Sequence, residues 1–266
     1  MINWRQFRLL AVDMDGTLAG ADHRVTPRTI AVLQRAERAG LRVVLVTGRS
    51  LPTVLHVWQK AGLSAPVVTF GGGLVLQPPE LSVVQAQAIP GEAVAQSLWL
   101  GRDLDLMVSL WTREGLWVTR PDHYAVELAD ITGMPLRILN AVPAEAVLKI
   151  GFGAAPARLD AVQDMLISQL GPIVGIARSL PQAVEATALG SSKHHALEAV
   201  LKYMGIAPAE VIAAGDGETD VGMLRLAGYA VVPANGMPGP LAVADRVIAH
   251  HDREAIAEFL DEVLSA

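Results

Sequence analysis

The stretch Leu9-Leu10-Ala11-Val12-Asp13-Met14-Asp15-Gly16-Thr17-Leu18 places two carboxylates directly after a short apolar run. The run Leu9 to Val12 has the length and composition of a buried strand. In an open α/β sheet, ligands bind in the crevice beyond the carboxyl ends of the strands. Asp13 and Asp15 are therefore expected to face a binding crevice, and they are the first residues that need an explanation.

Composition limits the classes of protein to consider. The chain has 266 residues, 52% of them hydrophobic, which is enough for one large globular core or two modest ones. Its net charge of -6 and the lack of a basic run argue against a nucleic-acid partner. The absence of cysteine excludes disulfides and thiol chemistry. Without an apolar N-terminal stretch, we expect a cytoplasmic protein that does not span a membrane, with a monomer as the default state.

Helix and strand patterns alternate at both ends of the chain. Thr26-Pro27 is typical of a helix start, and Gly40 of a helix end. Strands that are separated by helices pair in parallel, so the sequence predicts a Rossmann-like, doubly wound parallel sheet of the α/β class. The predicted helices span 27–39, 50–61, 192–204 and 221–227, and the predicted strands span 41–47, 66–70 and 211–214.

Hairpin signals replace this alternation in the middle of the chain. Pro78-Pro79 separates two apolar runs, and residues 112–115 separate Trp111 from a second strand-like run at 116–118. Together with helical stretches near 92–100 and 157–170, these signals indicate an inserted α+β domain at residues 80–182. The strand-like run at 182–186 is expected to return the chain to the core, which then comprises residues 1–79 and 183–266.

More carboxylates follow the predicted strand 211–214, in the stretch Gly215-Asp216-Gly217-Glu218-Thr219-Asp220. Right-handed crossovers place parallel strands side by side, so the strand ends at Asp13, Thr47 and Asp216 are expected to meet in one crevice. Carboxylates gathered there repel one another unless a cation lies among them, and oxygen ligands without His or Cys favour Mg²⁺. Such residues also occur in ordinary turns and helix caps. Their presence at two strand ends favours the metal site.

The chain contains, in this order, the motifs AVDMDGTL at 11–18 and LVTGR at 45–49, the residue Lys193, and the motif GDGETD at 215–220. In order, spacing and predicted context they closely resemble the haloacid dehalogenase (HAD) superfamily of phosphohydrolases. The insertion after the third core strand resembles the large α/β cap of the Cof-type sugar-phosphatase branch. This resemblance implies a HAD-like core with a substrate-selecting cap. It also implies Mg²⁺-dependent hydrolysis of a small phosphorylated metabolite, such as a sugar phosphate, through an aspartyl-phosphate.

The resemblance also implies a role for each matching residue. Asp13 corresponds to the nucleophile, and Asp15 to the general acid and base, whose backbone carbonyl binds the metal. Lys193 corresponds to the lysine that stabilises the phosphoryl group, and Thr47 to the phosphate-binding hydroxyl. The implied metal ligands are Asp13, Asp15, Asp216 and Asp220, and the implied substrate contacts are Thr47, Gly48, Arg49, Lys193 and Asn235.

Three positions depart from the family's pattern: Thr219 replaces an Asn, His194 a Gly, and Gly71 the Asn of an Asn-Gly pair. None of them removes a central group. Thr219 keeps an oxygen but lacks an amide donor, which bears on metal affinity. We assign no catalytic role to His194 or His195.

Substrate choice is only partly readable from the inserted domain. Four side chains around its predicted hairpin, those of Trp111, Arg113, Trp117 and Arg120, could hold a sugar or a second anion, although packing is their more common role. Two alternatives to a phosphatase stay open. One is a phosphomutase on the same core, and the other is a non-catalytic phosphate-binding module.

Overall fold

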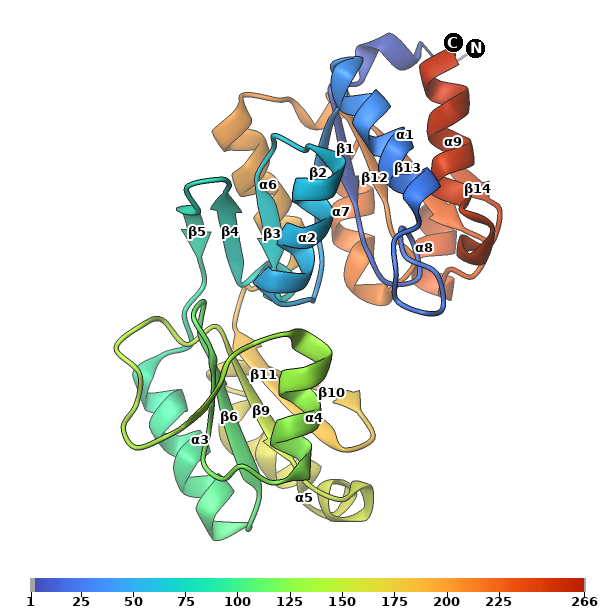
Figure 1. Cartoon of the computed structure of the whole chain (residues 1–266). Helices are drawn as coiled ribbons and strands as arrows, with labels where there is room; N and C mark the ends of the chain where they lie inside the picture. Colours follow the sequence, from blue (N-terminus) through green and yellow to red (C-terminus); the bar gives the residue numbers. More distant parts are fainter. Residues whose placement is uncertain (1–2, 266) are drawn as a thin grey trace. The chain divides into compact units, whose positions relative to one another are not determined.

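The computed structural model describes residues 3–265, which divide into two units (Figure 1). Unit 1 takes in the described residues of 1–49, 54–85 and 192–266. Unit 2 takes in residues 50–53 and 86–191. In the described part of the chain, no helix combines the length and the apolar character that a membrane crossing requires.

The central sheet of unit 1 is parallel, with its strands in the order β14-β13-β12-β1-β2. The central strand β1 is fully buried, and Val12 pairs with Leu45 on one side and with Ala214 on the other. A strand that is covered on both faces reads as a continuous apolar run, which is the pattern of these segments. The predicted doubly wound α/β fold is confirmed. The strands are β1 (Leu9–Val12), β2 (Arg42–Leu45), β12 (Val211–Ala214), β13 (Tyr229–Pro233) and β14 (Arg246–Ile248).

A three-stranded sheet, in the order β3-β4-β5, extends unit 1 beyond β2. A parallel bridge between Val46 and Val68 joins it to the central sheet. The turn between β3 and β4 contains Gly72 at a φ of +104°, where an added Cβ would lie 2.2 Å from the carbonyl oxygen of Ser192. Only glycine permits this approach, which seats the chain just before α6. The strands are β3 (Val67–Thr69), β4 (Leu74–Gln77) and β5 (Ser82–Ala86).

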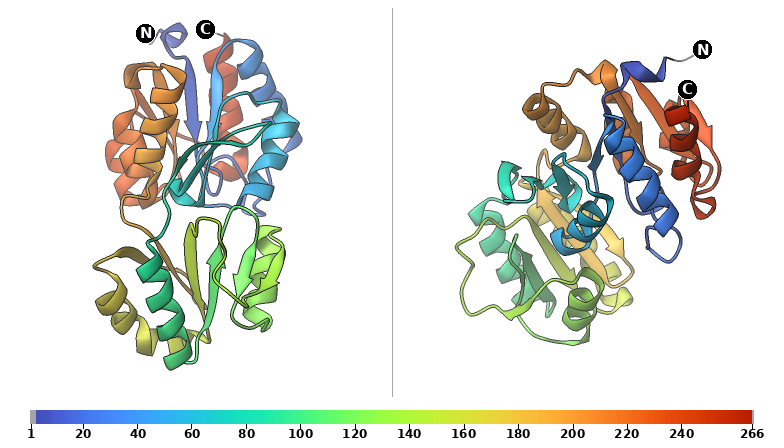
Figure 2. Two further views of the ribbon diagram at one scale, coloured as in Figure 1. Left: turned by 90° about the vertical axis from the view of Figure 1, so that its left-hand side faces the viewer. Right: turned by 45° about the horizontal axis from the view of Figure 1, so that its top comes forward.

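The helices of unit 1 cover both faces of the central sheet. α6 and α7 pack on the face that carries Leu9 and Ala11, and Figure 2 shows α1 and α9 together on the opposite side. Local signals set the ends of these helices. The side chain of Thr26 caps α1 by accepting from the Thr29 N–H, and α6 ends at Gly205 in the left-handed conformation. The helices are α1 (Pro27–Arg38), α2 (Leu51–Ala61, which belongs to unit 1 from Val54 onward), α6 (Lys193–Met204), α7 (Val221–Leu226), α8 (Pro238–Val243) and α9 (Ala255–Ser265).

Unit 2 is built on a sheet in the order β10-β11-β9-β6-β7-β8, in which only β7 and β8 pair in parallel. One face forms the apolar core of the unit, where α3 and α5 pack on residues such as Val108, Ile150 and Phe152. Its elements are α3 (Gly91–Asp103), β6 (Met107–Trp111), β7 (Leu116–Val118), α4 (His123–Thr132), β8 (Leu136–Ile138), β9 (Lys149–Gly153), α5 (Pro156–Leu170), β10 (Val174–Leu180) and β11 (Ala183–Ala188).

The strand β11 differs from the expectation for residues 182–186. Instead of returning the chain to the core, it pairs antiparallel with β9 and β10 in the sheet of unit 2. Its alternate residues Val184 and Ala186 are buried in the apolar core of that unit. Because the alternation of a strand does not say which sheet the strand joins, the sequence placed the end of the insertion at 182 and not at Ser191.

Candidate active site

Asp13 lies at the carboxyl end of the central strand, where its backbone N–H donates to the carbonyl of Ala214 at 2.9 Å. Its side chain is buried, as is that of Lys193, the first residue of α6. The Lys193 Nζ donates to Asp13 Oδ1 and to Asp220 Oδ1, at 2.6 Å in each case. One lysine therefore pairs with two carboxylates that lie far apart in the sequence.

Burial and charge act in opposite directions on this group. Burial raises the pKa of Asp13 to about 7, against the attraction of Lys193, and the negative charge of Asp220 adds to the rise. Burial lowers the pKa of Lys193, but its attraction to Asp13 and Asp220 is stronger, so the net pKa lies above its ordinary value. Lys193 thus stays charged, while Asp13 can take up a proton near neutral pH.

Asp220 organises the loop that follows β12. Its Oδ2 accepts the backbone N–H groups of Asp216 and Gly217 at 3.1 and 2.9 Å, while its Oδ1 accepts from Lys193. Gly215 has no room for a side chain, since an added Cβ would lie 2.6 Å from the Asp220 Cβ. Asp220 Oδ2 thus fixes the loop that presents Asp216, and Oδ1 ties this loop to Lys193.

Asp216 is held from two further segments of the chain. The Thr17 hydroxyl donates to its Oδ1 at 2.9 Å, and the Asn235 carboxamide donates to its Oδ2 at 3.4 Å and to the Gly16 carbonyl at 2.7 Å. Gly16 has a φ of +77°, and an added Cβ would lie 2.3 Å from Asp216 Oδ2. Burial raises the pKa of Asp216 above its ordinary value. The turn after β1 and the loop after β12 therefore fit against each other closely.

The donor set of this crevice suits a hard divalent cation. One carboxylate oxygen each from Asp13, Asp216 and Asp220 lies within 4.8 Å of the other two. Carboxylate oxygens without nitrogen or sulfur are the ligands that Mg²⁺ and Ca²⁺ prefer. The structure brings together three of the four predicted metal ligands through their side chains. The side chain of the fourth, Asp15, lies outside this group.

Asp15 is engaged by a different set of partners. Arg49 donates from Nε to Oδ2 at 2.8 Å and from Nη2 to Oδ1 at 2.6 Å, and His23 Nδ1 lies 2.8 Å from Oδ1. Burial raises the pKa of Asp15, but the hydrogen bonds from Arg49 and His23 outweigh it and hold the pKa below its ordinary value. Asp15 is therefore ionised in this arrangement.

Thr47 and Gly48 form the turn that follows β2. Thr47 is fully buried, its N–H donates to Val68 and its carbonyl accepts from Gly71, both at 3.0 Å. Its hydroxyl accepts the backbone N–H of Arg49 at 3.1 Å, which leaves the hydroxyl hydrogen for a second partner. Gly48 is exposed, so its backbone can be approached from solvent.

Three contacts of this site were not predicted from the sequence. His23 binds Asp15, Thr17 binds Asp216, and His251 ties the C-terminal part of the chain to the first loop. His251 Nδ1 lies 2.9 Å from the carbonyl oxygen of Ala19, and its backbone N–H donates to Asn235 Oδ1 at 3.1 Å. Thr17 stands inside a recognisable motif, but no sequence signal connects His23 or His251 to the carboxylates.

In unit 2, three of the four candidate recognition side chains have structural partners. Lys149 Nζ lies 4.0 Å from the centre of the Trp111 ring, and the Arg137 guanidinium lies 5.0 Å from the centre of the Trp117 ring. Arg120 forms ion pairs with Asp105 and Asp122.

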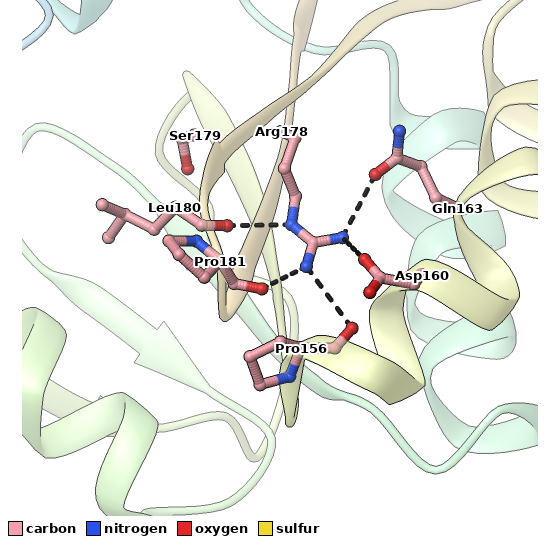
Figure 3. A pocket seen from close by; sticks show the side chains of 7 residues that line it. All are labelled: Pro156, Asp160, Gln163, Arg178, Ser179, Leu180 and Pro181. Carbon is pink, nitrogen blue, oxygen red and sulfur yellow. Dashed lines mark hydrogen bonds and ion pairs between the residues drawn. The ribbon is translucent and has the colours of Figure 1, made fainter.

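A hollow of about 540 Å³ lies between α5 and the turn that joins β10 to β11 (Figure 3). The Arg178 guanidinium fills its polar wall by donating to the carbonyls of Leu180 and Pro181 and by pairing with Gln163 and Asp160. Because its donors are used within the unit, Arg178 holds the turn in place and does not form a ligand site.

Comparisons with known proteins agree with this geometry. Residues 10–260 match a family model described as haloacid dehalogenase-like hydrolase. An HMP-PP phosphatase from Cronobacter sakazakii is 32% identical over 261 residues, covering 95% of this chain and 94% of the relative. An HMP-PP phosphatase from Serratia proteamaculans is 28% identical, covering 97% and 96% of the two chains. A solved haloacid dehalogenase-like hydrolase from Bacteroides thetaiotaomicron has a TM-score of 0.89 at 23% identity, over 97% of this chain and 99% of its own.

Proposed function

The chain belongs to the haloacid dehalogenase-like hydrolases and acts on phosphoric monoester bonds, and from this premise we propose that it is a Mg²⁺-dependent phosphatase that forms an aspartyl-phosphate on Asp13. The observation that carries the proposal is the contact between buried Asp13 and Lys193 beside two further carboxylates. Such an arrangement presents a nucleophile next to positive charge, which an attack on a phosphoryl group requires.

The proposed ligands of Mg²⁺ are the carboxylates of Asp13, Asp216 and Asp220, together with the backbone carbonyl of Asp15. Both oxygens of Asp220 already accept hydrogen bonds, so its main contribution is to fix Asp216 and Lys193 around the ion. When bound, the ion supplies positive charge that offsets the charge of the phosphoryl oxygens.

In the first step, a carboxylate oxygen of Asp13 forms a bond to phosphorus while the bond from phosphorus to the substrate oxygen breaks. Lys193 stays protonated and stabilises the negative charge on the phosphoryl oxygens. The Thr47 hydroxyl and the Gly48 N–H orient the same oxygens. Asp15 donates a proton to the leaving oxygen, which departs as the hydroxyl group of the product.

In the second step, Asp15 takes a proton from water as the water oxygen attacks phosphorus. The bond between phosphorus and the Asp13 oxygen breaks, which releases phosphate and restores the Asp13 carboxylate. A single side chain thus serves as acid and then as base, and the two half-reactions together consume one water molecule.

Arg49 controls when Asp15 can donate its proton. Asp15 is ionised while it accepts both hydrogen bonds from Arg49. Before Asp15 can act as an acid, it must lose these hydrogen bonds and take up a proton. An anionic substrate offers the guanidinium an alternative partner of the same charge as Asp15. We therefore assign Arg49 to substrate binding: its guanidinium would release Asp15 and donate its hydrogen bonds to the substrate instead.

The substrate is proposed to be a small phosphorylated metabolite. The similar proteins from Cronobacter sakazakii and Serratia proteamaculans are HMP-PP phosphatases, which makes HMP-PP the first compound to test, followed by sugar phosphates. The inserted unit 2 is proposed to determine the choice among them.

The direct test is phosphate release from HMP-PP and a panel of sugar phosphates, with Mg²⁺ and with EDTA. Wild-type protein should turn over at least one compound with Mg²⁺, and EDTA and Asp13→Asn should each abolish the turnover. Asp103→Asn, the same substitution at an exposed position of α3, should keep the wild-type rate. No release by folded, Mg²⁺-loaded protein would reject the proposal and favour a phosphomutase or a non-catalytic binding module.

A further inference from the structure

A second group of potential metal ligands lies on the first two turns of α6, outside the carboxylate site. His194, His195 and Glu198 each offer one ligand atom, and these atoms lie within 4.8 Å of one another. We propose that these three side chains form a site for Zn²⁺ or a similar transition-metal ion. Two imidazoles and a carboxylate are a typical protein ligand set for such ions, with water in the fourth position.

The orientation of His194 supports this site. Its Nδ1 lies 3.0 Å from the carbonyl oxygen of Gly222, and a carbonyl can only accept, so this nitrogen carries the ring hydrogen. In a neutral ring the lone pair is then on Nε2, the atom that faces Glu198. A metal-binding histidine characteristically donates its other nitrogen to a carbonyl or carboxylate in this way.

The spacing between His194 and Glu198 also suits a shared ion. The His194 Nε2 and the Glu198 Oε1 lie 3.6 Å apart, which is long for a hydrogen bond. Two ligand atoms on one tetrahedral zinc, with bonds of about 2.1 Å, are separated by about 3.4 Å. Residues at positions i and i+4 of a helix share a face, and both side chains are part-exposed, so small adjustments can complete the coordination.

A similar group, His250, His251 and Asp252, serves as the comparison. There His250 Nδ1 accepts the backbone N–H of Asp252 at 3.3 Å, and Asp252 Oδ1 accepts the N–H of Ala21 at 3.0 Å. The Nδ1 lone pair of His250 and one carboxylate oxygen of Asp252 thus already accept backbone hydrogen bonds, so they are less available to a metal ion. In the group on α6, His195 Nδ1 also has a partner, since it lies 3.0 Å from the Ser192 hydroxyl oxygen. The assignment of the metal to this group rests on His194, which its other nitrogen orients, and on Glu198.

The proposed ion would stabilise the part of unit 1 that carries Lys193. Lys193 immediately precedes His194, and His194 contacts Gly222, which lies two residues after Asp220. An ion that binds only the folded chain raises the thermal stability by mass action. The site therefore predicts a Zn²⁺-dependent rise in Tm that does not depend on turnover.

The test is Zn²⁺ titration of the full chain by calorimetry, with saturating Mg²⁺ to occupy the carboxylate site. Wild-type protein should bind one Zn²⁺ with micromolar affinity, and its Tm should rise in parallel. His194→Ala and Glu198→Gln should each weaken the binding by at least about tenfold and remove the rise in Tm. The matched control His250→Ala should bind Zn²⁺ as the wild type does.

Two results would overturn the proposal. One is wild-type protein that binds no Zn²⁺ at concentrations up to about one hundredfold above the expected micromolar Kd, where a site of that affinity would be almost fully occupied. The other is wild-type Zn²⁺ affinity in Glu198→Gln, a nearly isosteric change at a half-exposed side chain that leaves the fold intact. Because the readouts are binding and Tm, they stay informative even if the phosphatase proposal fails.

Discussion

Lowering the pH from about 8 to about 6 is expected to weaken Mg²⁺ binding by about tenfold, because a proton competes with the ion for Asp13. Burial raises the pKa of this carboxyl to about 7 in the metal-free protein. The ion binds the carboxylate form, so its affinity is highest above the pKa and falls as the pH drops through it. With a pKa of about 7, the ionised fraction is about 0.9 at pH 8 and about 0.1 at pH 6, a difference of about 1.4 kcal/mol in binding.

Titration calorimetry at several pH values measures this effect. At about pH 7, each bound Mg²⁺ should release about half a proton, which is counted from the heats in buffers of different ionisation enthalpy. The control Asp13→Asn removes the titrating group, so its binding should be weaker and should depend less on pH. Equal wild-type affinity at both pH values, without proton release, would refute the assignment of Asp13 as a protonatable ligand.

Three substitutions in unit 1 test other parts of the account. Lys193→Met leaves Asp13 and Asp220 buried without their cation and should lower the free energy of unfolding by about 3–5 kcal/mol in urea denaturation; a loss below about 1 kcal/mol would contradict the role of the ion pairs. Gly16→Ala places a Cβ 2.3 Å from Asp216 Oδ2 and should weaken Mg²⁺ binding by at least about tenfold in calorimetry, whereas unchanged affinity would count against Asp216 as a ligand. Arg49→Ala removes two hydrogen bonds from Asp15 while burial remains, so the pKa of Asp15 should rise in an NMR titration; an unchanged pKa would show that Arg49 does not control it.

Local sequence signals predicted the parts of the fold that depend on local physics. The apolar run before Asp13, the Thr26-Pro27 helix start and the hairpin at residues 112–115 all occur where they were expected. The expected convergence of strand ends also holds for the side chains of Asp13, Asp216 and Asp220. Their catalytic and metal-binding roles stay predictions.

The choice of partner could not be predicted in the same way. The alternating apolar pattern of β11 fits a strand in either sheet. The strand joins the sheet of unit 2 because it pairs there with β10 (Val174–Leu180) and β9 (Lys149–Gly153). At the site, the motifs identified Asp15 but not the direction of its side chain. That direction depends on Arg49 and on His23, a loop residue with a φ of +60°. Motifs thus indicate which residues gather, while the tertiary structure decides which oxygen binds which donor.

The central claim is that Asp13 itself becomes phosphorylated during turnover. The measurement is mass spectrometry of peptides from protein quenched in acid within the first turnover, in the presence of Mg²⁺ and the best substrate of the panel. The account predicts that the peptide containing Asp13 gains the mass of one phosphoryl group, and that Asp13→Asn never does. Rapid phosphate release without any phosphorylated peptide, or a phosphoryl group on a different residue, would contradict it.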